Sequence, residues 1–403
     1  MACLDPSAVP LLREYGVSET RGFVFDEDPA LKLPSYFAQW DEISSQIPSL
    51  LSKSADVRDV INRMPLLDYT RLDKITDYRR AHAVLAVIGE AYVWCRGDSG
   101  VPPCLPQNIA IPWVGVSKYL GLPPVVTHFD VVLNNWRKID VNGPLELSNL
   151  TTIYAFSPAG KDEQWFSLVT LQIELEAAPA VRCTVEAQRC VVEDDFETLI
   201  KCLQTIKHSV KKMQAVLLRM VEQCDYSVFY NQIRLFLAGW KGMKALPEGM
   251  LYEGVWEKPM QFVGGSAAQS STIHCLSECL GIDYSCSDDG DESASHANFI
   301  AEMRDYMPRQ HRDFLVALSR GPSVREYAKR LKLEGLTAEY NFCLATLEEF
   351  RSKHIQLVAR YITVESRKGT SQDHDSLKET GTGGTGIMSF LKYIRDKTRQ
   401  HVL

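Results

Sequence analysis

The 403-residue sequence has no long apolar run, no excess of basic residues and few cysteines for its length. Its longest helix-like apolar stretch, residues 81–94, includes Glu90 and is too short to cross a bilayer. Forty-four basic side chains against 51 acidic ones give a formal charge of −7, which argues against binding nucleic acid through a basic face. Eleven cysteines are too dilute for a disulfide scaffold, and the N-terminus lacks the pattern of a secretory signal. We therefore expect a cytoplasmic protein without nucleic-acid or membrane partners.

What the sequence does contain is enough apolar material, 45% of its residues, to form a large core. Apolar residues recur at three- and four-residue spacing over residues 196–221 and again over residues 336–362, which predicts two long amphipathic helices. Six prolines in residues 101–125 predict an extended, wrapping segment there instead of a long helix. We predict a mainly α fold, with a small mixed N-terminal domain (1–157) and a large helical domain (158–403).

His354 lies within the apolar stripe of the helix predicted for residues 336–362. An imidazole in that position faces the core of the helical domain. A buried neutral imidazole is a common metal ligand, including the proximal ligand of haem iron. The alternative is a structural histidine that is hydrogen-bonded to a carbonyl group, as buried polar groups usually are.

Arg234 lies among apolar neighbours in a segment, 226–240, that is predicted to be helical. A buried guanidinium without an anion is energetically costly, so Arg234 needs either a ligand anion or a carboxylate of the core. Phe166 and Thr170 are four residues apart and share a face if their segment is helical.

Residues 381–386 match G-x-G-x-x-G, but the polar residues before them cannot form the buried strand of a dinucleotide-binding unit. The polar, Gly/Thr-rich stretch 363–386 is therefore either a flexible linker or a mobile lid that closes over a ligand.

Taken together, these segments resemble the indoleamine 2,3-dioxygenase family nearly from end to end, in order and at matching separations. The segments that carry the resemblance are PCLPQNIAIP (103–112), GLPPVV (121–126), RLFLAGWKG (234–242), YEGVWE (252–257), GGSAAQSS (264–271), MRDYMP (303–308), Arg351, Ser352 and His354, and TGTGGTGIMSFLK (380–392). Within that family the sequence is more similar to the second, less efficient vertebrate paralogue than to the first.

The resemblance implies a fold in which a small N-terminal domain lies over a large all-α domain that holds haem. It implies non-covalent haem b, active in the ferrous state, which adds both atoms of dioxygen across the indole C2=C3 bond of L-tryptophan. The product is N-formylkynurenine, the first intermediate of the kynurenine pathway. The implied partners are L-tryptophan and related indoleamines, dioxygen and an electron donor that keeps haem reduced, and we expect a monomer.

The resemblance also implies roles for individual residues. His354 is the implied iron ligand, Arg351 lies near the haem propionates, and Thr170 is the implied catalytic hydroxyl in the distal pocket. The implied substrate contacts are Phe166, Phe229, Arg234, Gly265, Ser266, Ala267, Thr382 and Gly383, and of these Gly265, Ser266 and Ala267 also contact haem.

Four positions depart from the best-studied branch of the family. His128 replaces Tyr and Val131 replaces Cys at the back of the indole pocket, Thr170 replaces Ser, and Ser277 replaces an Asp that pairs with the proximal arginine. From these departures we expect weak tryptophan turnover with a high KM. The alternative is a haem-binding signalling or scaffold protein with vestigial dioxygenase activity.

Overall fold

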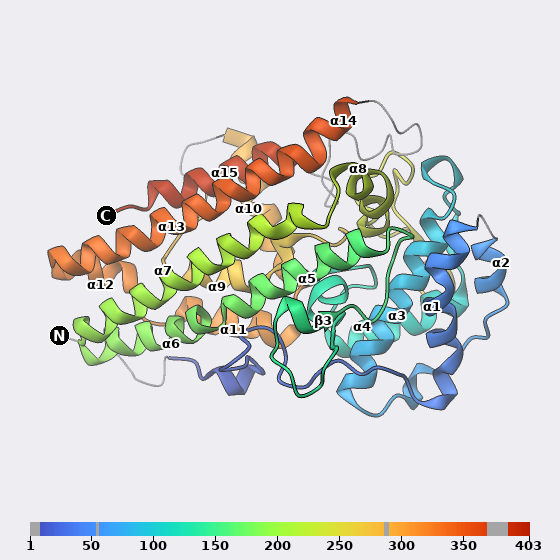
Figure 1. Ribbon diagram of the computed structural model, residues 1–403, viewed down its shortest axis with the longest axis horizontal. Coiled ribbons are helices and arrows are strands. Elements are labelled where there is room, and N and C mark those ends of the chain that lie inside the picture. The colour runs from blue at the N-terminus through green and yellow to red at the C-terminus, as the bar shows by residue number, and fades with distance from the viewer. Residues whose placement is uncertain (1–8, 54–55, 286–289, 369–385) are drawn as a thin grey trace.

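The computed structural model describes residues 9–53, 56–285, 290–368 and 386–403, and within them helices dominate (Figure 1). The strands in these residues are two residues long: β1 (Cys104–Leu105) pairs in parallel with β4 (Leu251–Tyr252), and β2 (Arg137–Lys138) pairs antiparallel with β3 (Leu150–Thr151). The prediction of a mainly α fold is confirmed. Within the described ranges, none of the helices is both long enough and apolar enough to cross a membrane.

The C-terminal part of the chain is built on long helices that lie side by side along the long axis of the molecule (Figure 1). Helix α7 packs against α5, α6 and α13, and α15 packs on α13. The bounds of these five helices are α5 (Lys161–Glu176), α6 (Ala178–Glu193), α7 (Phe196–Leu218), α13 (Glu334–Val358) and α15 (Ile387–Gln400). Helix α7 begins where Asp195 accepts a hydrogen bond from the backbone N–H of Thr198, and it buries the apolar face that the sequence pattern predicted.

The N-terminal helices gather at one end of the molecule, around α3 (Figure 1). Their bounds are α1 (Ala38–Ser52), α2 (Val57–Asn62), α3 (Ile75–Trp94) and α4 (Gln107–Leu120). Every side chain of α3 from Tyr78 to Trp94 is buried, so this helix forms the centre of its layer. Glu90 lies within it, and desolvation raises its pKa well above the ordinary value, although it accepts a hydrogen bond from the Trp94 indole.

The expectation of an extended segment at residues 101–125 is wrong for residues 107–120, which form α4. Five of the six prolines lie outside the helix, where proline costs little: Pro106 immediately precedes it, and Pro123 and Pro124 follow its end. Gly121 ends the helix with φ +71°. Only Pro112 lies inside it, where proline removes one backbone hydrogen bond, and burial of the apolar face outweighs that loss.

The helix predicted for residues 226–240 is irregular and ends at Leu237. It consists of α8 (Tyr226–Val228), a π-helical turn (Phe229–Ile233) and a 3-10 turn (Arg234–Leu237). The remaining α-helices are α9 (Ser271–Cys279), α10 (Gly290–Met303), α11 (Arg309–Arg320), α12 (Val324–Leu331) and α14 (Glu365–Arg367), and further π-helical turns span Phe129–Leu133 and Ala359–Val364.

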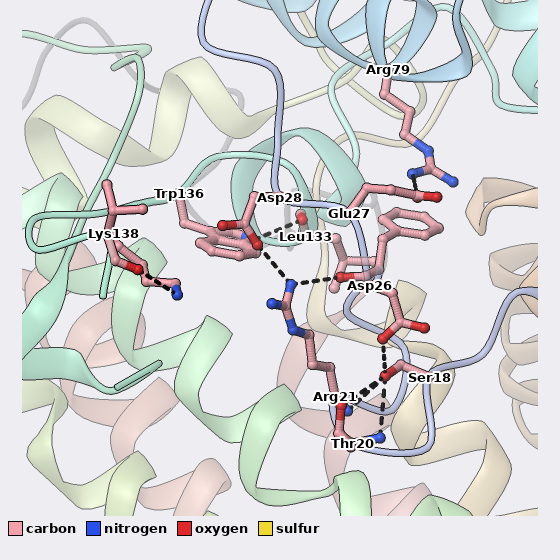
Figure 2. Close-up of polar contacts among 12 residues, drawn as sticks. Ser18, Thr20, Arg21, Asp26, Glu27, Asp28, Arg79, Leu133, Trp136 and Lys138 are labelled. Atoms are coloured by element: carbon pink, nitrogen blue, oxygen red, sulfur yellow. Dashed lines mark hydrogen bonds and ion pairs between the residues drawn. The ribbon is translucent and has the colours of Figure 1, made fainter. Parts of the chain in front are cut away.

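An N-terminal segment, residues 17–28, is tied to the body of the protein by polar contacts (Figure 2). The Ser18 hydroxyl accepts a hydrogen bond from the backbone N–H of Arg21 at 2.9 Å, and the Arg21 guanidinium pairs with Asp28 at 2.8 Å. Glu27 pairs with Arg79 of α3 at 3.2 Å. These contacts hold Phe23 and Phe25 against His311 of α11, with ring centroids 5.0 and 5.1 Å away.

His311 is fully buried, and neither of its ring nitrogens has a hydrogen-bond partner in the part of the chain that the structure describes. Desolvation, reinforced by the charge of Arg79, lowers the pKa of His311 to about 3. In the unfolded chain this histidine takes up a proton below about pH 6.5, whereas in the folded protein it stays neutral down to about pH 3. The free energy of unfolding therefore falls as the pH drops from 6.5 toward 3. Replacing His311 with Phe removes this loss, which amounts to about 2 kcal/mol at pH 5.

We therefore expect His311→Phe to be more stable than the wild type at pH 5, by a margin that shrinks at pH 8. Urea unfolding at both pH values measures this margin. The exposed His208 provides the control, because His208→Phe should show no such pH-dependent gain. A margin for His311→Phe that is equal at the two pH values would contradict the assignment of a neutral buried imidazole.

Candidate active site

A cavity of about 300 Å³ lies between α5, α9, α13, α15 and the irregular helix at 226–237. Its lining is largely apolar, and its volume is at the lower end of the range for small-molecule sites. Nine of the residues singled out from the sequence line it together: Phe166, Thr170, Phe229, Arg234, Gly265, Ser266, Ala267, Arg351 and His354. Their separate roles stay predictions, and Thr382 and Gly383 lie outside the described residues.

His354, on the cavity face of α13, is half-buried. Its ring makes no hydrogen bond to any residue that the structure describes, so the carbonyl partner of a structural histidine is not found there. Desolvation lowers the pKa of His354 to about 4. The imidazole is therefore neutral at pH 7 and presents a nitrogen lone pair, the form that binds a metal ion.

Arg351 lies one turn before His354 on α13 and is held by neutral groups. Its Nη2 donates to the Ser277 hydroxyl at 3.0 Å and to the Tyr284 hydroxyl at 2.6 Å, and its Nη1 donates to the Ile394 carbonyl at 2.6 Å. Its Nε is buried and has no acceptor among the described residues. Ser277 thus contacts the arginine without neutralising it, and the cation remains available to an anionic group of a ligand.

Two aromatic rings form one wall of the cavity. Phe166 of α5 and Phe229 of the π-helical turn lie with ring centroids 5.0 Å apart, and Tyr361 packs edge-on against Phe229 at 5.4 Å. The Thr170 hydroxyl, one turn along α5, donates its hydrogen to the Phe166 carbonyl at 2.8 Å. Because that hydrogen is engaged, the Thr170 oxygen meets the cavity as an acceptor.

Arg234 follows Phe229 at the junction of the π-helical and 3-10 turns, and only 1% of its surface is exposed. Desolvation lowers its pKa to about 10, against the opposing effect of the Tyr230 hydroxyl. Arg234 thus remains a cation at pH 7. A buried guanidinium that lines an apolar cavity is suited to bind a carboxylate.

The loop at 263–270 lines the cavity, and its backbone at Gly264 passes very close to the backbone of residues 237–239. A Cβ atom on Gly264 would lie 2.3 Å from both the Gly239 nitrogen and the Leu237 carbonyl oxygen, so only glycine fits. Gln269 fixes the other end of the loop, because its amide donates to the Gly264 carbonyl at 2.8 Å and its oxygen accepts from the His128 N–H at 2.9 Å.

His274 holds the same loop against α9. Its Nε2 lies 2.9 Å from the Ala268 carbonyl, and its Nδ1 accepts a hydrogen bond from Arg304 at 3.4 Å. Desolvation, with the charge of Arg304, lowers the pKa of His274 to about 4, which keeps it neutral. Sequence reasoning did not identify Gln269 or His274 as parts of the site, because both act through contacts with loop backbone that no local pattern reveals.

Sequence reasoning also missed Glu174, one turn after Thr170 on the cavity face of α5. Its carboxylate lies 2.9 Å from the Nε2 atom of His128, and both residues line the cavity. They are 46 residues apart in the chain, so spacing alone gives no signal that they meet. The cavity therefore contains a buried histidine–carboxylate pair in which His128 was singled out from the sequence and Glu174 was not.

Comparisons with known proteins show the family of the chain. The model of the family described as indoleamine 2,3-dioxygenase matches residues 11–401. The chain is 39% identical to indoleamine 2,3-dioxygenase 2 of Homo sapiens (98% of this chain, 97% of the relative) and 37% identical to indoleamine 2,3-dioxygenase 1 of Rattus norvegicus (98% and 96%). It is also 33% identical to a myoglobin of Haliotis madaka (96% and 98%). The greater similarity to the second paralogue is as predicted, and the chain belongs to the indoleamine 2,3-dioxygenase family.

Proposed function

We propose that this protein is a haem-dependent dioxygenase that converts L-tryptophan into N-formylkynurenine by adding dioxygen across the indole C2=C3 bond. Family membership over nearly the whole chain supports this function. The structural observation that carries it is the neutral His354 ring, which has no partner among the described residues and shares a cavity with the buried Arg234 cation.

The residues of the cavity fit haem b. His354 would bind the iron, and the apolar lining suits the porphyrin ring. Arg351 would pair with a propionate. The propionate would supply the negative charge that the neutral partners Ser277 and Tyr284 do not provide. Gly265, Ser266 and Ala267 would lie along the flat faces of haem and substrate. When bound in the ferrous state, haem supplies the electrons that make dioxygen reactive toward the indole.

The protein's own contribution is to bind and orient tryptophan. Arg234 would pair with the substrate carboxylate, and Phe166 and Phe229 would enclose the indole. The Thr170 oxygen would accept the hydrogen bond of the indole N–H, because its own hydrogen is engaged by Phe166. Thr382 and Gly383, outside the described residues, would contact the substrate's ammonium and carboxylate groups. A strong base is not required among these residues.

Three further features belong to the proposal. The enzyme needs an external electron donor to keep haem ferrous, it acts as a monomer in the cytoplasm, and its substrates extend to related indoleamines. The alternative of a haem-binding signalling or scaffold protein is favoured by no observation on the described residues.

Reconstitution of the purified protein with hemin, followed by reduction and addition of L-tryptophan in air, tests the function. We expect a Soret band that shifts when tryptophan is added, and N-formylkynurenine that forms with a high KM. A preparation that stays colourless after reconstitution would refute the proposal, and so would a coloured one that gives no product. Saturation at low micromolar tryptophan would contradict only the expectation of a high KM.

A further inference from the structure

The pair formed by His128 and Glu174 lies in the wall of the cavity and has no part in the function proposed above. His128 immediately precedes the π-helical turn at 129–133, and Glu174 lies in the last turns of α5. Only 5% of His128 and 2% of Glu174 is exposed. A charged or polar pair buried this deeply in a largely apolar cavity is costly unless its hydrogen bonds are satisfied.

Glu174 is satisfied by donors on both oxygens. Its Oε1 accepts from His128 at 2.9 Å and from the Ser270 hydroxyl at 2.6 Å, and its Oε2 accepts from the Thr272 hydroxyl. Burial would raise the pKa of Glu174, but the hydrogen bonds from His128, Ser270 and Thr272, with the charge of His128, lower it. Glu174 is thus a carboxylate, and the His128 nitrogen that faces it carries a hydrogen.

The other ring nitrogen of His128, Nδ1, is not satisfied in the same way. It makes no hydrogen bond to the residues that the structure describes, although His128 lines the cavity. The backbone N–H of His128 donates to Gln269 at 2.9 Å, which fixes the residue from behind. Glu174 engages Nε2, so Nδ1 is the ring atom that is left to form a hydrogen bond with a ligand in the cavity.

Glu174 lies about two turns of α5 beyond Phe166, the aromatic residue that this helix gives to the cavity. Phe166, Thr170 and Glu174 follow one another at four-residue intervals along one face of α5, so Glu174 is about 12 Å along the helix axis from Phe166. Phe229 and Arg234 are on the segment that meets Phe166. An indole whose carboxylate is on Arg234 would therefore direct its benzo edge toward Val131 and His128, which line the same cavity.

We propose that the His128–Glu174 pair is a specificity site at which Nδ1 of His128 forms a hydrogen bond with a hydroxyl group on the benzo ring of the substrate. This inference rests on the proposed function. A plain indole presents only C–H groups there and leaves the buried Nδ1 without a partner, which costs binding energy. A hydroxylated tryptophan supplies the missing partner. His128 therefore determines how strongly the protein prefers a hydroxylated tryptophan over a tryptophan that has a substituent of the same size without a hydroxyl group.

The test compares 5-hydroxy-L-tryptophan with 5-methyl-L-tryptophan, which has a substituent of similar size but no donor, and with L-tryptophan. Dissociation constants from Soret titration of the haem-loaded protein, and kcat/KM for each compound, are measured in parallel. We expect the wild type to favour the hydroxy over the methyl compound by about tenfold, the contribution of one hydrogen bond to a buried polar atom.

Two variants remove Nδ1. His128→Phe and His128→Leu both lack ring nitrogens, and in each the Ser270 and Thr272 hydroxyls still donate to Glu174, so the buried carboxylate stays hydrogen-bonded. In both, the preference for the hydroxy compound should disappear. The control, His208→Phe, makes the same change at an exposed position and should keep the preference.

The possible failures are distinguishable. If the haem-loaded wild type neither binds nor oxidises any of the three compounds, the proposed function falls and this inference falls with it. If it oxidises tryptophan but the ratio of kcat/KM for the hydroxy compound to that for the methyl compound is the same in the wild type, His128→Phe and His128→Leu, only the specificity site is refuted.

Discussion

Replacing His354 with alanine should give a protein that does not retain haem. Three histidines of the described residues line the cavity, and only His354 has both ring nitrogens without a hydrogen-bond partner, since Glu174 engages His128 and Ala268 and Arg304 engage His274. Non-covalent haem depends on its axial ligand, so we expect haem content to fall at least tenfold. The ratio of Soret to protein absorbance after reconstitution and gel filtration measures this loss.

The fold of the His354→Ala variant should survive, because the His354 ring makes no hydrogen bond to the described residues. Far-ultraviolet circular dichroism and thermal unfolding of the haem-free proteins test this. Added imidazole should restore part of the Soret absorbance, since the cavity left by the side chain is the size of the missing ligand. Haem content equal to that of the wild type, without added imidazole, would remove His354 as the iron ligand and with it the basis of the proposed site.

The sequence was sufficient to predict those parts of the site that depend on a helical pattern. His354 interrupts an apolar stripe, and Arg234 is a cation among apolar neighbours. The sequence pattern alone therefore predicted that both side chains face the interior. Their roles came from resemblance. The structure adds that they line one cavity with Phe166 and the loop at 265–267, which no local pattern can establish.

Contacts between distant segments account for what was missed. The partners of Glu174 lie 46 to 98 residues away in the chain, on two segments with no shared pattern. The helix at 107–120 was missed because the prediction relied on the number of prolines in residues 101–125 and not on where they lie. Only one of them falls inside the helix. The irregular turns at 229–237 were missed because a π-helical turn has nearly the apolar spacing of an α-helix, and it is tertiary packing that decides between them.

Replacing Arg234 with alanine should abolish productive binding of tryptophan while haem stays bound. The guanidinium is 1% exposed, and its charge persists at pH 7 because its pKa, although lowered, is about 10. Loss of one partner from a buried ion pair costs about 2–5 kcal/mol, so kcat/KM should fall at least about thirtyfold. Arg234→Lys keeps the charge but not the planar pair of donors, and we expect it to lie between the wild type and alanine.

Tryptamine, which lacks the carboxylate, separates loss of the ion pair from general damage to the cavity. The wild type should discriminate strongly between tryptophan and tryptamine, whereas Arg234→Ala should bind the two with similar affinity, as measured by Soret titration of haem-loaded protein. Haem content equal to that of the wild type shows that the cavity is intact in the variant. If Arg234→Ala keeps both the KM for tryptophan and the discrimination against tryptamine, then the carboxylate is bound elsewhere. That result would also contradict the orientation of the indole toward His128, because this orientation was inferred from Arg234.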